Sequence, residues 1–366
     1  MTDPRPSASR PRARDLGLPF PGLPGPLNAI TDVAGVTVGF TTLTDPARAM
    51  RTGVTAIRPR PDAGLPQPVL AGHFSLNGNG EMTGTHWIDD AGYFCGPVCI
   101  TNTHAIGAVH HGVTQWMIRH YADFFRNHHG WAMPVVAETY DGTLNDINAL
   151  HVTPDHAIAA IEAARGGPVA EGATGGGNGM ICYEFKGGTG TSSRRAEVDG
   201  RTYTVGVLLQ ANFGRRPRLR ILGRPVGELM PDGTFDRNLP AGEEAGSVIV
   251  VIATDAPLSR TALRALAKRG ALGIARTGTE GGNGSGDVFL AFSTAGPGPM
   301  PELAPAHLTR SEINTEYLNP LYLAAVEATE EAVVNALVAG EDTPSFSPPG
   351  HVVRGIDTAR LAALFR

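Results

Sequence analysis

Long apolar runs are absent from this sequence. No stretch of the 366 residues approaches the roughly 18 consecutive apolar residues that a membrane-spanning helix needs, so we expect no membrane contact. Met1 to Arg14 is rich in proline and arginine and has no apolar centre, which excludes a secretory signal and predicts a disordered tail over residues 1–14. A cytoplasmic protein is the expectation.

Cysteine is scarce as well, with 3 residues in the whole chain. Such a small, odd number suits a reducing compartment better than a disulfide framework. Cys95 and Cys99 have a spacing that could bind a metal ion, but no second pair completes the site, and buried free thiols are the better interpretation for these two and for Cys182. The histidines between residues 110 and 129 lack carboxylates at ligand spacing. We therefore expect neither a metal ion nor another cofactor.

Basic patches and nucleotide-binding motifs are also missing. The net charge of -5 and the pI of about 6.2, without a basic stripe, argue against a nucleic-acid partner. The glycine-dense segment at 77–84 lacks the Gly-Lys-Ser/Thr of a phosphate-binding loop. Those at 171–179 and 186–194, both predicted to be loops, lack the strand–GxGxxG–helix order of a dinucleotide site.

What the sequence does contain is a series of short apolar runs among 47 glycines and 29 prolines. These runs predict strands at 28–40, 53–59, 69–77, 134–137, 203–210 and 288–292. Helical spacing and capping residues predict helices at 106–124, 153–165, 259–270 and 320–338. The segment 215–243 is predicted to be an exposed connector. Together these features predict one α/β domain over residues 15–366, with sheets covered by helices.

The most informative stretch runs from Ala245 to Asp255, where a loop rich in glycine and acids meets an apolar, mostly β-branched run. Its length and composition predict a strand buried on both faces, with Ser247 at its mouth and the flexible Gly246 before it. A serine in that place can be a presented nucleophile, and it can equally be the ordinary start of a strand. Ser285 also follows a glycine beside an apolar strand.

Neither serine has the surroundings of an α/β-hydrolase nucleophile, because Gly-x-Ser-x-Gly is absent around Ser247 and Ser285. No histidine stands near either serine in the sequence. A serine without histidine can use its own α-amine, with a pKa of about 8, as the base if the chain is cut in front of it. Gly246 suits such a cut, since the Ser247 hydroxyl must attack the preceding carbonyl.

The run from Glu138 to Asp146 places dense acids, a phenol and an amide directly after the predicted strand at 134–137. This composition suits the rim of a pocket. An ordinary acidic turn explains it equally well on this segment alone.

Several segments, taken together, resemble the L-aminopeptidase D-esterase / β-peptidyl aminopeptidase family of self-processing serine peptidases. They are Arg12 to Gly17, Glu138 to Asp146, Lys186 to Arg194, Gly246 to Leu258 and Asn283 to Asp287. They follow in order along essentially the whole chain after the tail, and their joint occurrence makes the resemblance specific.

This resemblance implies a four-layer αββα sandwich, similar to N-terminal-nucleophile hydrolases but with different connectivity. It implies a precursor that cleaves itself between Gly246 and Ser247, giving an α chain over 15–246 and a β chain over 247–366. It also implies a homo-oligomer, a tetramer of αβ units.

The resemblance further implies the roles of individual residues. Ser247 is the expected nucleophile, with its freed α-amine as the base, and Asn212 is the expected donor to the oxyanion. Ser285 and Asp287 match the Ser-x-acid pair that orients and polarises the nucleophile, although Asp287 is one methylene shorter than the Glu of family members. Tyr140 and Glu138 match residues that line the site. We hypothesise that Glu138 or another acid pairs with the free amine of the substrate.

The implied function is the release of N-terminal residues from small peptides, amides or esters, with β-peptides and D-amino acid esters among the candidate substrates. One alternative is an acyltransferase similar to ornithine acetyltransferase, but that type uses threonine, and Ser247 speaks against it. A second alternative is a non-catalytic small-molecule binding protein on the same scaffold.

Overall fold

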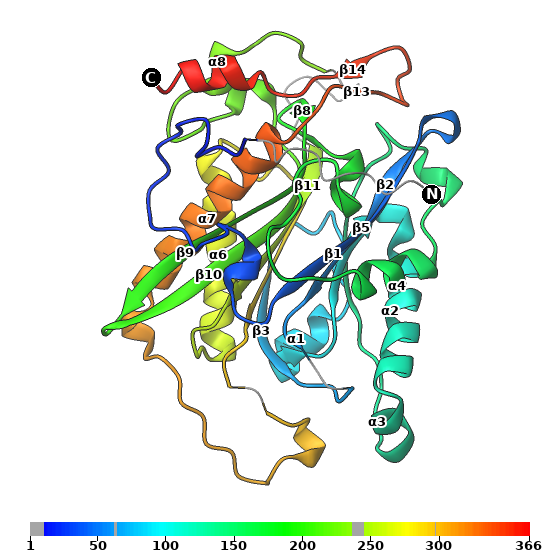
Figure 1. Cartoon of the computed structure of the whole chain (residues 1–366), viewed down its shortest axis with the longest axis vertical. Helices are drawn as coiled ribbons and strands as arrows, with labels where there is room; N and C mark the ends of the chain where they lie inside the picture. The colour runs from blue at the N-terminus through cyan, green and yellow to red at the C-terminus, as the bar shows by residue number, and fades with distance from the viewer. Residues whose placement is uncertain (1–10, 62–63, 236–244, 297) are drawn as a thin grey trace.

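The computed structural model describes residues 11–61, 64–235, 245–296 and 298–366, and two sheets lie face to face at its centre (Figure 1). The first sheet has the strand order β1-β2-β5-β6 and contains β1 (Thr37–Asp45), β2 (Met50–Arg58), β5 (Val98–Asn102) and β6 (Val135–Thr139). The second sheet has the order β4-β3-β12-β11-β10-β9 and contains β3 (Val69–Ser75), β4 (Tyr93–Phe94), β9 (Gly188–Val198), β10 (Arg201–Asn212), β11 (Ala245–Thr254) and β12 (Gly284–Ser293). In this sheet β11 and β12 are parallel, whereas β10 and β11 are antiparallel.

Helices cover the outer face of each sheet and complete four layers (Figure 1). The first sheet carries α2 (Ile106–His120) and α4 (Pro154–Glu162), and the second carries α6 (Arg260–Arg276) and α7 (Asn319–Val338). The shorter elements are α1 (Thr85–Ala91), α3 (Ala122–Asn127), α5 (Val226–Leu229), α8 (Thr358–Ala363), β7 (Ile181–Cys182), β8 (Phe185–Lys186), β13 (Thr343–Pro344) and β14 (Val352–Val353). The predicted αββα sandwich is confirmed.

Strand β11 lies at the centre of the second sheet, as its composition predicts. Val248 and Val250 pack into the core under α6 and α7, whereas Ile249 and Val251 pack between the two sheets. All of these side chains are completely buried, and each such burial contributes about 1.5–3 kcal/mol. A strand that is apolar on both faces is stable only where both faces are covered, so the prediction of a doubly buried strand is confirmed.

Strand β9 shows what several of the glycines do in this chain. A Cβ atom added to Gly190 would lie 2.0 Å from the backbone oxygen of Ala332 in α7. The glycine therefore lets helix and strand approach closely, which a larger residue would prevent. The prediction of a loop over 186–194 is wrong from Gly188 onward, because glycine there serves packing rather than turning.

Predictions elsewhere in the chain also differ from the structure. Helix α6 continues past Gly270 to Arg276, because Gly270 packs against the ring of Phe289 instead of capping the helix. The segment 215–235 is not an exposed connector, since Leu219 and Ile221 are fully buried in it; residues 236–243 lie outside the described residues. Strand β1 starts at 37 rather than at 28.

The N-terminal segment is anchored to the body by ion pairs. Arg12 Nε lies 2.7 Å from Glu171 Oε2, and Arg14 Nε lies 2.9 Å from Glu331 Oε1. The buried Arg194 of β9 also contacts Glu331, at 2.6 Å. Residues 1–10 of the predicted tail lie outside the described residues, whereas Arg12 and Arg14 pack on the domain. The segment from Arg12 to Gly17 therefore holds the start of the domain in place.

Within the described ranges, no helix has both the length and the apolar character to cross a membrane. The same residues contain no group of three or more histidine, cysteine or acidic side chains close enough to hold a metal ion. Cys99 and Cys182 are buried thiols, as predicted, and Cys95 is half buried.

Candidate active site

Ser247 is the third residue of β11, and only 3% of it is exposed. Its Cα lies opposite Asn212 of β10 on one side and opposite Gly286 of β12 on the other. Residues directly opposite each other in antiparallel strands share a face of the sheet, with Cβ atoms about 4.5–5.5 Å apart. Ser247 and Asn212 therefore lie together on the face that looks toward the first sheet.

Gly246 is required both by close packing and by its φ of +157°, a backbone conformation that L side chains rarely adopt. A Cβ atom built on it would lie 2.2 Å from the backbone oxygen of Asn212 and 2.9 Å from Cα of Phe213. Any larger residue at this position must displace the end of β10. The bond between Gly246 and Ser247 is thus held against the strand that carries Asn212.

The side-chain amide of Asn212 is fixed by a hydrogen bond at each end. Its Oδ1 accepts a hydrogen bond from the backbone N–H of Ile181 at 2.9 Å, and its Nδ2 donates to the backbone oxygen of Tyr140 at 2.9 Å. Because an amide nitrogen carries two N–H groups, one donor remains beside Ser247 for a ligand oxygen. A fixed donor of this kind can stabilise a developing oxyanion.

Ser285 and Asp287 form a buried pair at the start of β12. Ser285 Oγ donates a hydrogen bond to Asp287 Oδ1 at 2.6 Å, and Asn77 Nδ2 donates to Asp287 Oδ2 at 3.2 Å. Side chains alternate along a strand, so the pair lies on the face toward α6, opposite to the face of the Ser247 side chain. In the register of β11 and β12, Ser285 stands opposite Gly246. The pair therefore neighbours the Gly246–Ser247 peptide bond.

Glu138 lies at the end of β6 and is 4% exposed. Its Oε1 accepts a hydrogen bond from the backbone N–H of Glu81 at 3.0 Å, and its Oε2 accepts one from the hydroxyl of Thr103. Burial raises the pKa of the Glu138 carboxyl, and the hydrogen bonds from Thr103 and Glu81 partly oppose that effect. Because Ala137 faces the second sheet, strand alternation directs Glu138 to the other face of β6.

The glycine-dense loop from Asn77 to Met82 connects the surroundings of Ser247 with those of Glu138. A Cβ atom on Gly286, which neighbours Ser247 in the sheet, would lie 2.2 Å from the backbone oxygen of Asn79. Further along the loop, Met82 pairs with Ala137 of β6. The loop thus packs closely on β12 at Gly286 and connects the two sheets beside the site.

Tyr140 follows β6 and is 51% exposed. Its ring folds back over Gly142, where an added Cβ would lie 2.2 Å from the phenol oxygen. Its backbone carbonyl is the group that accepts the hydrogen bond from Asn212. Tyr140 therefore contributes its backbone to the fixation of Asn212 and exposes its phenol nearby.

Asp141 is a site residue that the sequence did not single out. It is completely buried and accepts hydrogen bonds from Asn102 Nδ2 and Asn145 Nδ2, both at 3.1 Å. Burial raises the pKa of its carboxyl to about 7, although the hydrogen bonds lower it. This network holds the turn that carries the carbonyl of Tyr140. The acid-rich run was the only sequence signal for it, because Asn102 lies on a different strand.

Gln210 joins the two sheets two residues before Asn212. Its Nε2 donates to Thr139 Oγ1 at 2.7 Å and to the backbone oxygen of Thr101 at 3.0 Å. Gln210 and Asn212 therefore both donate hydrogen bonds from the end of β10 to the segment that carries Thr139 and Tyr140.

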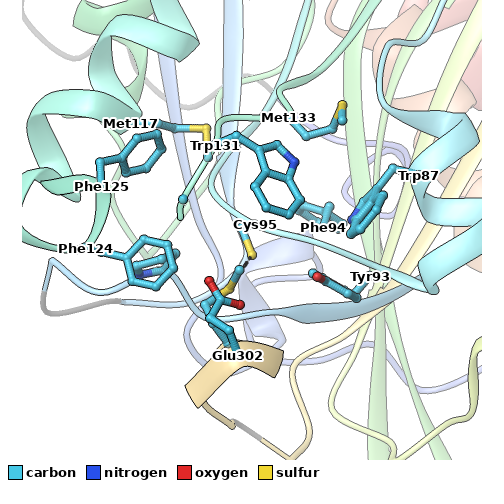
Figure 2. Close-up of a pocket in the computed structure, with 13 residues that line it drawn as sticks. Trp87, Tyr93, Phe94, Cys95, Met117, Phe124, Phe125, Trp131, Met133 and Glu302 are labelled. Atoms are coloured by element: carbon cyan, nitrogen blue, oxygen red, sulfur yellow. Dashed lines mark hydrogen bonds between the residues drawn. The ribbon is translucent and has the colours of Figure 1, made fainter. Parts of the chain in front are cut away.

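A separate, small apolar hollow lies at the other end of the second sheet. Figure 2 shows Phe124 and Trp87 on opposite sides of it, with Cys95 between them. Phe94, which also lines the hollow, pairs with Val69 of β3. The next residue of β3, Leu70, pairs with Ser293 of β12, and Ser293 lies about 23 Å along that strand from Gly286. This hollow is therefore not part of the site around Ser247.

A Gly-Ser bond at the start of a central strand, in one of two stacked sheets flanked by helical layers, is the arrangement of a serine hydrolase of the N-terminal-nucleophile type. The sequence pattern of Peptidase family S58 matches residues 28–349. The chain belongs to Peptidase family S58 and is a serine aminopeptidase. The resemblance stated from the sequence is confirmed, and the two non-peptidase alternatives are set aside.

The relatives agree with this assignment over almost the full length. The chain is 47% identical to the beta-peptidyl aminopeptidase BapA of Sphingosinicella microcystinivorans, over 98% of this chain and 93% of the relative. It is similar to the structure of an L-aminopeptidase D-Ala-esterase/amidase from Ochrobactrum anthropi, with 52% identity, a TM-score of 0.92 and 98% of each chain covered. That protein is described as a variant of the Ntn hydrolase fold. A Burkholderia sp. beta-aminopeptidase shares 45% identity, with a TM-score of 0.85 and 96% and 97% covered.

Proposed function

We propose that the chain is made as a precursor and cleaves itself between Gly246 and Ser247. The Ser247 hydroxyl attacks the Gly246 carbonyl carbon, and the peptide bond becomes an ester on Ser247. Water then hydrolyses that ester, which releases the carboxylate of Gly246 and leaves Ser247 with a free hydroxyl and a free α-amine. In the mature enzyme that α-amine accepts the proton of the hydroxyl as it attacks a substrate carbonyl.

The observation that carries this proposal is the joint position of three neighbours on β10 and β11. Gly246 packs against Asn212, Asn212 stands opposite Ser247, and the Asn212 amide keeps one N–H available. The carbonyl oxygen of the bond before Ser247, or of a bound substrate, gains negative charge during attack. A fixed amide donor at that place supports assigning Asn212 to the oxyanion.

We assign Ser285 and Asp287 to an interaction with the α-amine that cleavage creates on Ser247. Ser285 stands opposite Gly246, so it neighbours the position that the new amine occupies after cleavage. The carboxylate of Asp287, hydrogen-bonded to Ser285, favours protonation of a nearby amine and hence its use as a base. This assigns the pair to the amine of Ser247 rather than to its hydroxyl.

The substrates that we propose are small peptides, amides or esters with a free N-terminal amine. Both β-peptides and D-amino acid esters or amides belong to this set, since the relatives are named for β-peptidyl and for D-Ala-esterase/amidase activity. Although the Glu138 side chain lies on the face of β6 away from the second sheet, we propose that it binds the substrate ammonium. Its Oε1 accepts a hydrogen bond from the N–H of Glu81, and the neighbouring Gly80 packs on Gly286, which stands opposite Ser247. Each of the Glu138 carboxylate oxygens has one donor in the structure and retains a lone pair for a second. Tyr140, half exposed and two residues further along the chain, is proposed to line the same site.

We also propose a cytoplasmic homotetramer of αβ units, on the basis of the buried thiols and the family resemblance. Light scattering of the purified protein tests the tetramer, since a monomer or dimer at micromolar concentration would contradict it. Cell fractionation of the producing organism tests the compartment.

Intact-mass spectrometry of purified protein tests the self-cleavage. The expected result is two fragments that meet at Gly246 and Ser247, and a Ser247→Ala variant that stays full length. The same variant should hydrolyse neither an aminoacyl ester nor an aminoacyl amide. Hydrolysis by pure, uncleaved Ser247→Ala protein would move the nucleophile to another residue.

A further inference from the structure

Lys186 in β8 is a completely buried cation close to the site. Its Nζ donates hydrogen bonds to the backbone oxygen of Gly187 at 2.8 Å and to that of Gly177 at 3.4 Å. Within the described ranges no carboxylate forms an ion pair with it, and burial lowers its pKa to about 7, helped by the charge of Arg51. An ammonium without an acidic partner is costly to bury, which raises the question of what it supports.

The two carbonyls that Lys186 binds belong to two segments that fold against each other. Gly177 lies in the buried turn Gly175–Gly179, and Gly187 joins β8 to β9. The backbone N–H of Gly187 also donates to the oxygen of Met180 at 2.9 Å, and Met180 follows that turn. The ammonium therefore clamps the glycine turn to the β7–β8 hairpin.

The hairpin in turn orients the amide of Asn212. Ile181 of β7 stands opposite Lys186 in the register of the hairpin. Its backbone N–H donates to Asn212 Oδ1 at 2.9 Å. This contact fixes the orientation of the Asn212 side-chain amide, because the flipped orientation would point its NH₂ group at the backbone N–H of Ile181. With Oδ1 held there, Nδ2 is the atom that meets Tyr140 and the space beside Ser247.

We propose that Lys186 is a positioning residue for the oxyanion donor: its ammonium holds the β7–β8 hairpin so that Ile181 keeps the Asn212 amide aimed at the carbonyl under attack. This inference rests on the proposed function, in which Asn212 stabilises the oxyanion. Lys186 touches no reacting atom and acts through Ile181 and Asn212 alone.

The test compares Lys186→Met with Arg60→Met, which removes another buried cation. Arg60 is 8% exposed and donates to the backbone oxygen of Ser293, at the other end of β12 from Ser285. Rates are measured with L-alanyl and β-alanyl p-nitroanilide and divided by the cleaved fraction found by intact mass. We expect kcat to fall about tenfold for Lys186→Met, with KM changed less than twofold, and Arg60→Met to keep both constants. A Lys186→Met kcat no lower than that of Arg60→Met overturns the proposal.

A double-mutant cycle with Asn212→Ala separates positioning from general loss of structure. If Lys186 acts through Asn212, adding Lys186→Met to Asn212→Ala lowers kcat by less than twofold. An equal loss in both backgrounds overturns the proposal. Should Lys186→Met fail to fold by circular dichroism, Lys186→Arg, which keeps the cation and misplaces its donors, is measured under the same two criteria.

Ser247→Ala, measured in parallel, separates a failure of the proposed function from a failure of the role proposed for Lys186. Hydrolysis retained by Ser247→Ala contradicts the proposed function itself. An inactive Ser247→Ala, together with a Lys186→Met that behaves like Arg60→Met, contradicts only the role of Lys186.

Discussion

The replacement of Gly246 by alanine tests the packing of the bond that we propose is cleaved. The new Cβ atom would lie 2.2 Å from the oxygen of Asn212 and 2.9 Å from Cα of Phe213, both backbone atoms that cannot rotate away. Overpacking of this kind costs about 1–3 kcal/mol. The strain is relieved by moving the end of β10, which takes Asn212 out of its contacts with Ile181 and Tyr140. Loss of one oxyanion donor slows acyl transfer by about 10²–10³-fold.

We therefore expect the Gly246→Ala precursor to cleave at least about tenfold more slowly than wild type. Its melting temperature should fall by several degrees, at roughly 2 °C for each kcal/mol in a chain of this size. Once cleaved, residue 246 is a free chain end that can move aside, so the mature variant should show a kcat close to wild type. Intact mass over time, thermal unfolding of the precursor and steady-state rates of the mature form measure these three quantities.

Gly107→Ala is the matched control, because an added Cβ at Gly107 in helix α2 meets no atom within 4 Å. The same chemical change there should leave cleavage unaltered and stabilise the helix slightly. A Gly246→Ala precursor with the wild-type cleavage rate and the wild-type melting temperature would refute the claim that close packing requires glycine at this position. A mature Gly246→Ala enzyme with strongly reduced kcat would refute the view that the strain belongs to the precursor.

Asn212→Ala should lower kcat by about 10²–10³-fold with little change in KM, since it removes a contact made in the transition state; a change confined to KM would count against that role. Glu138→Gln should raise KM for free-amine substrates about tenfold or more, because a charge-assisted hydrogen bond contributes about 1.5–3 kcal/mol. Unchanged KM in steady-state assays would remove Glu138 from ammonium binding. Asp141 has a folded-state pKa of about 7, above its usual value of 3.8. The folded state therefore holds the Asp141 proton more tightly than the unfolded state does, and stability falls as pH rises from about 4 to 7, by on the order of 4 kcal/mol. In urea unfolding between about pH 4 and 7, the free energy of unfolding should fall less steeply with pH for Asp141→Asn than for wild type. The same dependence on pH in both proteins would show that Asp141 does not cause the fall.

The residues that the sequence identified best were those marked by local pattern. Ser247 stands where an apolar run meets a glycine, and the helix at 320–338 was predicted within one residue of its start. A doubly apolar strand such as β11 indicates a layered fold by itself, since both faces must be covered. Local pattern was therefore enough for an α/β domain with covered sheets and for the strand that carries the serine, whereas the four-layer arrangement was implied by the family resemblance.

The contacts around Ser247 were not predictable in that way, because they join segments far apart in the chain. Asn212 is held by Ile181 and Tyr140, which lie 31 and 72 residues away from it. Lys186 looked like part of a glycine loop, and nothing nearby indicated that its ammonium would be buried. Register between strands decides such contacts, and one sequence does not give the register between distant strands.

The glycines show how a local interpretation can reverse in the folded protein. Gly190 and Gly270 were interpreted as a loop residue and a helix end, yet both lie inside regular elements where a Cβ atom would strike a neighbour. Gly246 belongs to the same group. The sequence suggested a flexible residue before Ser247, whereas the structure holds it against Asn212 within a sheet. If this bond is the one that breaks, it does so in a fixed geometry, with the oxyanion donor in place before the reaction starts. Cleavage then creates the α-amine without rebuilding the site, and the same Asn212 serves the precursor and every later substrate.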